Sequence, residues 1–181
     1  MSLRPFRLPR LVPLAALLAL AGCGSDQPQF PPPCPRLSLL QDASDIVRFA
    51  GAAGAAKDPR TITYAARITA VPAHCEAAGT NEVRAVMHIV AQVRRGPAAT
   101  GDTVAIPYFI AITQDGRVLD ELNYTLGAKF AGNVDVVTAQ GGTIDFSVPV
   151  TPAVSAAAYH LYVGFRLSPD ELAYNRQAAP Q

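Results

Sequence analysis

The chain has 181 residues, of which 15 are Lys or Arg and 14 are Asp or Glu, so its formal net charge is +1. This near balance, without a block of like charge, argues against a protein that binds nucleic acid or another polyanion. Half of the residues are hydrophobic, and a chain of this length is one domain that can bury a sizeable core.

The first 22 residues have the organisation of an export signal. Basic residues come first, then an apolar run over 11–21, then small residues before Cys23. The run has eleven residues and contains Pro13, whereas a membrane-spanning helix needs about 20 apolar residues. We therefore predict that 1–22 is a signal peptide that is removed. Its basic residues are Arg4, Arg7 and Arg10.

The sequence Leu20-Ala21-Gly22-Cys23 resembles the lipobox of bacterial lipoproteins. The alternative is a secreted protein with a chance cysteine at its cleavage site, because an ordinary secretory signal needs none. The resemblance implies that Cys23 becomes the first residue and is lipidated, with diacylglycerol on its thiol and an acyl chain on the new amino terminus. Two or three acyl chains hold a protein on a bilayer almost permanently.

The residue after Cys23 bears on the choice of membrane. In this class an Asp at that place tends to retain the protein at the inner membrane, and here the residue is Gly24. The resemblance therefore implies a lipid-anchored protein of the bacterial cell envelope, on the periplasmic side of the outer membrane rather than at the inner membrane.

Cleavage changes the net charge and leaves a linker ahead of the domain. Removing 22 of the 181 residues takes away three of the 15 basic ones, so 159 residues remain, with 12 basic against 14 acidic side chains. Residues 23–33 then form the lipid anchor and a proline-rich tether of extended polyproline type. At about 3.1 Å per residue the tether reaches about 30 Å, close to the bilayer. A proline-rich ligand for a partner domain is the alternative.

Two cysteines remain once Cys23 carries lipid. In an oxidising compartment Cys34 and Cys75 are expected to form a disulfide. The loop of about 40 residues would contribute about 4 kcal/mol in the chain-entropy model. Two unpaired thiols or a metal-binding pair are the alternatives, although a metal site would need further ligands.

Most of 34–167 alternates with period two, which predicts half-buried β-strands. The run 104–112 is apolar on both parities, as expected of a central strand, although Pro107 fits better at an edge or a bulge. Short strands are also expected at 37–40 and 46–49. The residues expected to face inward are Ile62, Tyr64, Ala66, Ile68 and Ala70; Val83, Ala85, Met87, Ile89, Ala91 and Val93; Ile144, Phe146, Val148 and Val150; and Ala157, Tyr159, Leu161, Val163, Phe165 and Leu167.

Turn signals separate these strands. Asp115-Gly116 predicts a type I′ hairpin, and 131–133 and 140–142 are expected to be turns. The fold predicted for 34–167 is an all-β, antiparallel sandwich of immunoglobulin or fibronectin type with seven to nine strands. A short C-terminal helical turn follows in 168–181, because Ser168, Pro169 and Glu171 form a capping box with a first-turn proline. We expect helix over 169–174 and fraying over 177–181.

Two segments resemble a group of uncharacterised proteobacterial envelope lipoproteins. They are Cys34-Pro35-Arg36-Leu37-Ser38-Leu39-Leu40 with the following Asp42-Ala43-Ser44-Asp45, and the ending 167–176. The similarity covers nearly the whole mature chain. It implies a lipid-anchored, sandwich-like domain and brings no known activity.

Candidate chemistry is sparse. His88 and His160 fall on solvent-facing parities of separate strands, and His74 adjoins Cys75 in an expected loop, so no pair has metal-ligand spacing. The mature chain keeps one methionine, Met87, which argues against a copper carrier. No nucleophile motif or phosphate-binding loop occurs. We predict no catalytic residue, no metal ligand and no cofactor.

Two functions follow as hypotheses. The first is a non-catalytic binding or structural module that is held on the membrane by its lipid and contacts an envelope protein. The second is a small-molecule or metal carrier, or an enzyme, with a site assembled from distant strands; its candidate residues are His88, His160 and Tyr162.

Overall fold

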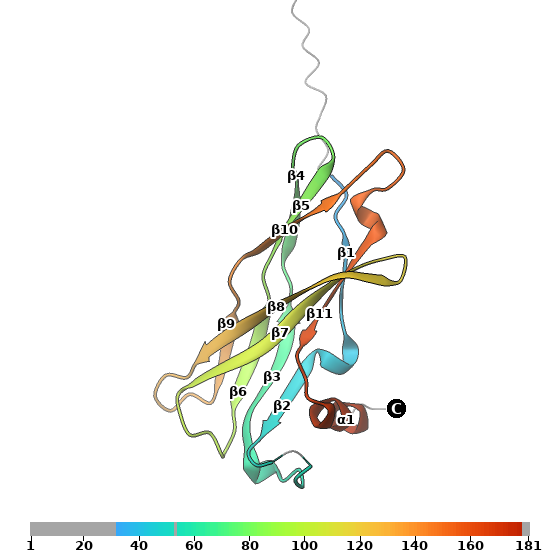
Figure 1. The fold of residues 1–181 in the computed structure, drawn as a ribbon. Coiled ribbons are helices and arrows are strands. Elements are labelled where there is room, and N and C mark those ends of the chain that lie inside the picture. The colour runs from blue at the N-terminus through green and yellow to red at the C-terminus, as the bar shows by residue number, and fades with distance from the viewer. Residues whose placement is uncertain (1–31, 53, 179–181) are drawn as a thin grey trace, which may run out of the picture. The chain divides into compact units, whose positions relative to one another are not determined.

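Strands dominate the regular structure of the protein (Figure 1). The computed structural model describes residues 32–52 and 54–178. The predictions for the signal peptide, for Cys23 and for most of the tether lie outside these residues. The strands are β1 (Arg36–Leu39), β2 (Asp45–Phe49), β3 (Ile62–Ala70), β4 (Ala73–Ala77), β5 (Glu82–Met87), β6 (Val90–Arg95), β7 (Thr103–Gln114), β8 (Arg117–Lys129), β9 (Val136–Gln140), β10 (Ile144–Pro149) and β11 (Tyr159–Phe165).

Four helical segments accompany the strands in the described part of the chain. Three are 3₁₀ turns, and one is an α-helix at the C-terminal end; none of them is long and apolar enough to cross a membrane. They are η1 (Gln41–Ala43), η2 (Pro59–Thr61), η3 (Ala156–Ala158) and α1 (Pro169–Ala178).

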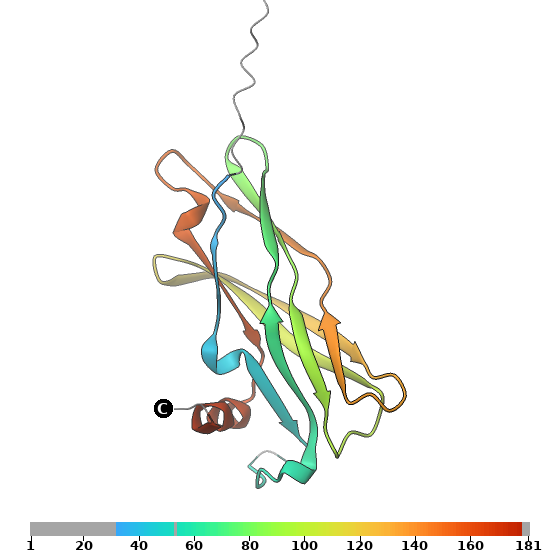
Figure 2. The same cartoon turned by 180° about the vertical axis from the view of Figure 1, so that it is seen from behind.

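One layer of the sandwich contains three long strands that are each interrupted once, together with β2. Its sheet β2-β3-β6-β9 continues into the sheet β4-β5-β10, because β3 leads into β4, β5 into β6 and β9 into β10 (Figures 1 and 2). The interruptions stay hydrogen-bonded to their neighbours. His88 N–H donates to the Pro72 carbonyl at 3.2 Å, and Gly141 N–H donates to the Ile89 carbonyl at 2.9 Å.

The other layer has the strand order β1-β11-β7-β8. β1 runs parallel to β11, and the remaining pairs are antiparallel. The predicted all-β antiparallel sandwich with a C-terminal helical turn is confirmed. Eleven strands are present in the described residues because three long strands are broken, and counting each of these once gives eight. The order within the layers differs from the ABED and CFG order of an immunoglobulin constant domain.

The core lies between the two layers, and the predicted alternation places it well. Val83, Met87 and Ile89 are at most 4% exposed, and they share one buried cluster with side chains of the other layer such as Ile110 and Phe165. Ala70 is exposed, because it lies at the end of β3. Ala157 lies in the turn η3 rather than in a strand, and its neighbour Ala156 is the fully buried alanine.

Pro107 lies within the central strand β7 but at a point where one neighbour ends. β11 stops at Phe165, which is opposite Tyr108. The pairing of β7 with β11 therefore covers residues 108–114 of β7 and does not include Pro107. The Pro107 carbonyl still accepts a hydrogen bond from Arg166 N–H at 2.9 Å. A central strand therefore tolerates this proline, because its missing N–H falls beyond the last strand pair on that side.

The predicted turns have two different outcomes. At Asp115-Gly116 the φ angles are 50° and 75°, as a type I′ turn requires, so that hairpin is confirmed. The turn predicted at 140–142 is wrong, because these residues join β9 to β10 without reversing the chain. A Cβ on Gly141 would lie 3.0 Å from the Tyr108 hydroxyl and 3.2 Å from Ile89. The glycine serves close packing at this break.

The helix α1 begins as predicted and ends later. Ser168 Oγ accepts from Glu171 N–H at 3.2 Å, and a Glu171 carboxylate oxygen accepts from Ser168 N–H at 2.8 Å, which completes the capping box. The helix extends to Ala178, so the predicted end at Tyr174 and the fraying predicted for 177–178 are wrong, while 179–181 lie outside the described residues. Asn175 accounts for the extension, because its amide donates to the carbonyls of Asp42 and Asp45.

The disulfide predicted between Cys34 and Cys75 is present, with a Cα–Cα distance of 5.6 Å. It joins the residues just before β1 to the middle of β4. The chain therefore enters the sandwich at the end formed by β4, β5 and β10, whereas α1 lies at the opposite end (Figures 1 and 2).

Gly96 should be the least replaceable of the glycines at this opposite end. A Cβ there would lie 2.0 Å from the Ile62 carbonyl oxygen, so Gly96→Ala must displace backbone and is expected to cost about 1–3 kcal/mol of unfolding free energy. Urea denaturation would measure it. Gly101→Ala is the matched control, because a Cβ there meets no atom within 4 Å, and it should stay within about 0.5 kcal/mol of the wild type. Equal losses in both variants would contradict the packing argument.

Candidate functional site

The outer face of the β1-β11-β7-β8 layer gathers aromatic and polar side chains. Strand register defines it in rows: Arg36, His160, Thr113 and Val118 are in line, and Ser38, Tyr162, Ala111 and Glu121 form the next row. Phe109 and Asn123 follow, with Arg166 beyond them. Directly opposite residues of paired strands point to the same face, so these side chains are neighbours. We refer to this set as the outer face.

His160 and Tyr162 are two residues apart on β11, lie on the same face of the sheet, and stack. Their ring centroids are 4.2 Å apart and the ring planes differ by 17°. Ser38 on β1 holds the imidazole from the side, with 2.8 Å between Ser38 Oγ and His160 Nε2. Both rings are half-buried, so the pair is ordered and still reaches solvent.

A second cluster on the outer face surrounds Phe109. The Arg166 guanidinium lies over the Phe109 ring, 5.2 Å from its centroid. Arg166 Nη2 also donates to the side chains of Glu121 and Asn123 on β8. The outer face therefore has an aromatic centre with charged and amide groups along its rim.

Shallow hollows lie at both ends of this aromatic centre. One, of about 350 Å³, is lined by Arg36, Thr113, His160 and Tyr162 together with the β7–β8 turn. The other, of about 580 Å³, lies beside Arg166, Glu121 and Asn123. Burial raises the pKa of Tyr124, which lines the second hollow, and nearby Asp145 and Asp120 raise it further. Tyr124 therefore stays protonated, but its ring stacks on Tyr108 on the core side of the sheet, so it is not part of the outer face.

The structure brings together only two of the three residues proposed for a carrier or catalytic site. His160 and Tyr162 stack, whereas His88 lies at the break between β5 and β6 in the other layer. His74 lies on β4 near Glu76, 3.4 Å away, and is mostly exposed. Among residues 32–52 and 54–178 no group of three or more His, Cys, Asp or Glu side chains could hold a metal ion.

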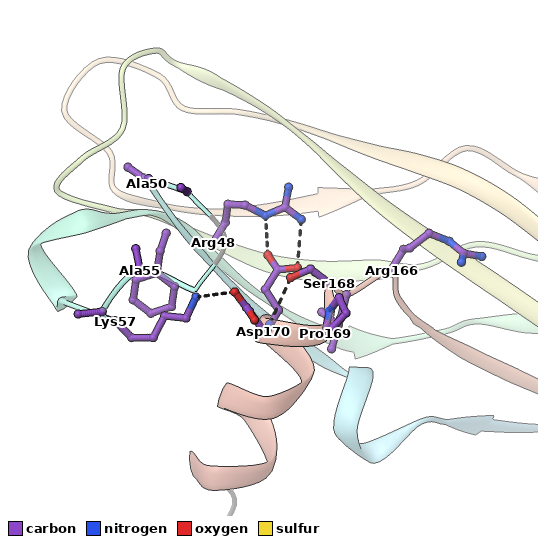
Figure 3. A pocket seen from close by; sticks show the side chains of 14 residues that line it. Arg48, Ala50, Ala55, Lys57, Arg166, Ser168, Pro169 and Asp170 are labelled. Carbon is purple, nitrogen blue, oxygen red and sulfur yellow. Dashed lines mark hydrogen bonds and ion pairs between the residues drawn. The ribbon is translucent and has the colours of Figure 1, made fainter.

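A separate pocket of about 580 Å³ lies where β11 leads into α1 (Figure 3). Its wall includes the end of β2, the alanine-rich loop that follows, and the first turn of α1. Figure 3 shows Lys57 reaching toward Asp170 from the loop, 3.8 Å away, while Arg166 points out of the pocket. Gly54 N–H also donates to Asp170, at 2.6 Å.

The buried charge of this pocket is Glu171, whose side chain is 7% exposed. Arg48 donates to it twice, from Nε at 2.6 Å and from Nη2 at 3.5 Å. The same carboxylate caps α1, so its oxygens are bonded within the protein. These contacts hold the helix against β2, and we regard the pocket as part of that packing.

The outer face offers stacking surfaces and hydrogen-bonding groups. Ser38 and His160 have the separation of a nucleophile and a base. In the part of the chain that the structure describes, the imidazole makes no other side-chain hydrogen bond, whereas a catalytic base is oriented by a third group. The arrangement is suited to binding through aromatic and polar contacts.

Sequence reasoning found Tyr162 and His160 but missed Ser38, Phe109 and Arg166 as their neighbours. Phe109 carried a signal, because 104–112 is apolar on both parities and only one of its faces can meet the other layer. Ser38 carried none, because its position beside His160 depends on the parallel pairing of the first and last strands.

No protein-family model matches this chain, and no curated protein or solved structure gives a match either.

Proposed function

We propose that this protein is a lipid-anchored, non-catalytic binding module of the bacterial cell envelope, and that it contacts an envelope protein through its outer face. The resemblance to proteobacterial envelope lipoproteins, carried by the lipobox and by the two segments named above, supports this location. On this proposal it resides at the periplasmic side of the outer membrane and binds neither nucleic acid nor a cofactor.

The outer face is the observation that carries the proposal. The stacked His160 and Tyr162 and the Phe109–Arg166 pair form a half-buried surface on the side of the sheet that faces away from the core, beside the η1 turn that packs on Gly164. Tyrosine and arginine are enriched at the centres of protein interfaces, where a polar rim surrounds an apolar core. This face has the same composition and arrangement.

The disulfide supports an extracytoplasmic setting. Disulfides persist in oxidising compartments such as the bacterial periplasm. Cys34 is exposed, and its bond to Cys75 joins the start of the domain to β4.

Site-specific photocrosslinking in intact cells tests the binding face. A photoreactive residue at Tyr162 is expected to capture a defined envelope protein, because this ring lies at the centre of the outer face. The same residue at Gln92, exposed on β6 in the other layer, is the matched control and should capture little. Phe109→Ala should weaken capture from position 162 about tenfold or more, as loss of an interface aromatic does. Equal capture from both positions, or none, would contradict the proposal.

Cys23→Ser tests the anchor. Because the thiol of Cys23 is the proposed attachment point, the variant should lose its acyl chains and move from the membrane fraction to the soluble fraction, or remain as unprocessed precursor. Fractionation of cells followed by mass spectrometry of the N-terminal peptide would measure this. A wild-type N-terminal peptide that begins before Cys23, or carries no lipid, would refute the anchor.

A further inference from the structure

Three inward-facing side chains lie in a row at the α1 end of the sandwich. Arg48 on β2 is opposite Tyr64 on β3, and Tyr64 is opposite Arg95 on β6. Tyr64 is 6% exposed and points into the core, and opposite residues share a face, so both arginines point inward beside it. We call these three residues the inner row.

Arg48 shows what an arginine of the inner row binds. Its Nε and Nη2 atoms form one edge of the guanidinium, and this edge meets the two oxygens of Glu171 at 2.6 and 3.5 Å. Side-on pairing of two N–H groups with two anionic oxygens is the geometry in which arginine recognises carboxylate and phosphate. The first arginine of the row is therefore neutralised by a carboxylate of the chain itself.

Arg95 presents the same edge without a protein partner. Its Nε and Nη2 atoms are buried and make no hydrogen bond within the described residues, and the hydroxyl of Tyr64, on the next strand of the row, makes none either. No ion pair among these residues includes Arg95, although its guanidinium lies 4.9 Å from the centroid of the Phe130 ring. The inner row with Glu171 thus carries two positive charges and one negative charge.

Hydrogen-bond donors that are buried without an acceptor lower the stability of a protein. A charge without its counter-charge also lowers the stability of the folded protein. Burial raises the pKa of Tyr64; Arg48 opposes the shift and Glu171 adds to it. The hydroxyl therefore stays protonated and is a third donor without a partner in the inner row.

We propose that the Nε/Nη2 edge of Arg95, together with the Tyr64 hydroxyl, binds a small anion with two available oxygens, a carboxylate or a phosphate-like oxyanion. The anion takes the place at Arg95 that Glu171 takes at Arg48. It would enter from the α1 end, because Arg95 as a whole is only partly buried while its binding edge faces inward. This site lies between the layers and is separate from the outer face.

Melting temperatures of the purified full chain test the proposal. At equal pH and ionic strength, acetate or phosphate in place of chloride should raise the melting temperature by about 2–4 °C once the site is saturated. Arg95→Lys keeps the charge but removes the paired edge, so it should lose most of this shift. Arg94→Lys, one residue earlier and exposed on the opposite face, is the matched control and should keep it. Tyr64→Phe should reduce the shift.

The pattern across the variants decides the result. An equal shift in wild type, Arg94→Lys and Arg95→Lys would mean a general salt effect on folding and would overturn the proposal. A response to acetate alone or to phosphate alone identifies which anion the site takes. Crystals of the wild type soaked in selenate give an independent measurement: anomalous density beside Arg95 supports the site, and an ordered water there instead refutes it.

Discussion

Glu171→Gln is expected to lower the free energy of unfolding by about 2–4 kcal/mol, measured by urea denaturation of the full chain. Removing one partner of a buried ion pair typically costs about 3–5 kcal/mol, because the other charge is left buried without its counter-charge. The expected loss is smaller here, since the Arg48 side chain is 38% exposed and can recruit water. Glutamine keeps the shape of the side chain, so the loss reports on the charge.

An exposed pair on the same helix provides the control. Arg176 on α1 contacts Asp42 at 2.8 Å, but both side chains are about half exposed, so Asp42→Asn should cost no more than about 1 kcal/mol. In an Arg48→Gln background, Glu171→Gln should lower the free energy of unfolding by clearly less than in the wild type, because the positive charge of Arg48 that Glu171 neutralises is already absent. Additive losses would show that Glu171 acts through helix capping alone.

Replacing both Cys34 and Cys75 with serine is expected to cost about 2–4 kcal/mol of unfolding free energy. The two residues are 41 apart in sequence, so the disulfide removes a large amount of conformational freedom from the unfolded chain. Thermal or urea unfolding would measure the loss. A reducing agent should lower the stability of the wild type by a similar amount and leave the double-serine variant unchanged. A wild type that resists reduction and a variant of unaltered stability would contradict this account.

The fold could be predicted largely because one side of each strand is buried. Alternation over 82–94 places Val83 to Val93 inward correctly, although it does not reveal that the strand breaks at His88 and Ile89. The break depends on contacts with Pro72 and Gly141, which are distant in sequence. Local chemistry was sufficient for the hairpin at Asp115-Gly116 and for the start of α1.

Long-range pairing is what the sequence leaves open. The outer face depends on β1 lying parallel to β11, which brings Ser38 to His160 across 122 residues. Arg48 and Glu171 are 123 residues apart, and the sequence assigned Glu171 only its capping role. Period two indicates which face a residue occupies, but it does not indicate which strand is its neighbour, so clusters that span strands were not predictable.

The position of the disulfide determines how the domain would respond to a mechanical load. β1 is a short edge strand, joined to β11 by four residue pairs, and a pull on the chain before it would otherwise fall on those pairs. The bond between Cys34 and Cys75 diverts that force into β4, which is paired along its length with β5. A domain held at its N-terminal end would therefore pass part of the load to the β4–β5 pair, and β1, with the Ser38 side of the outer face, would carry less of it.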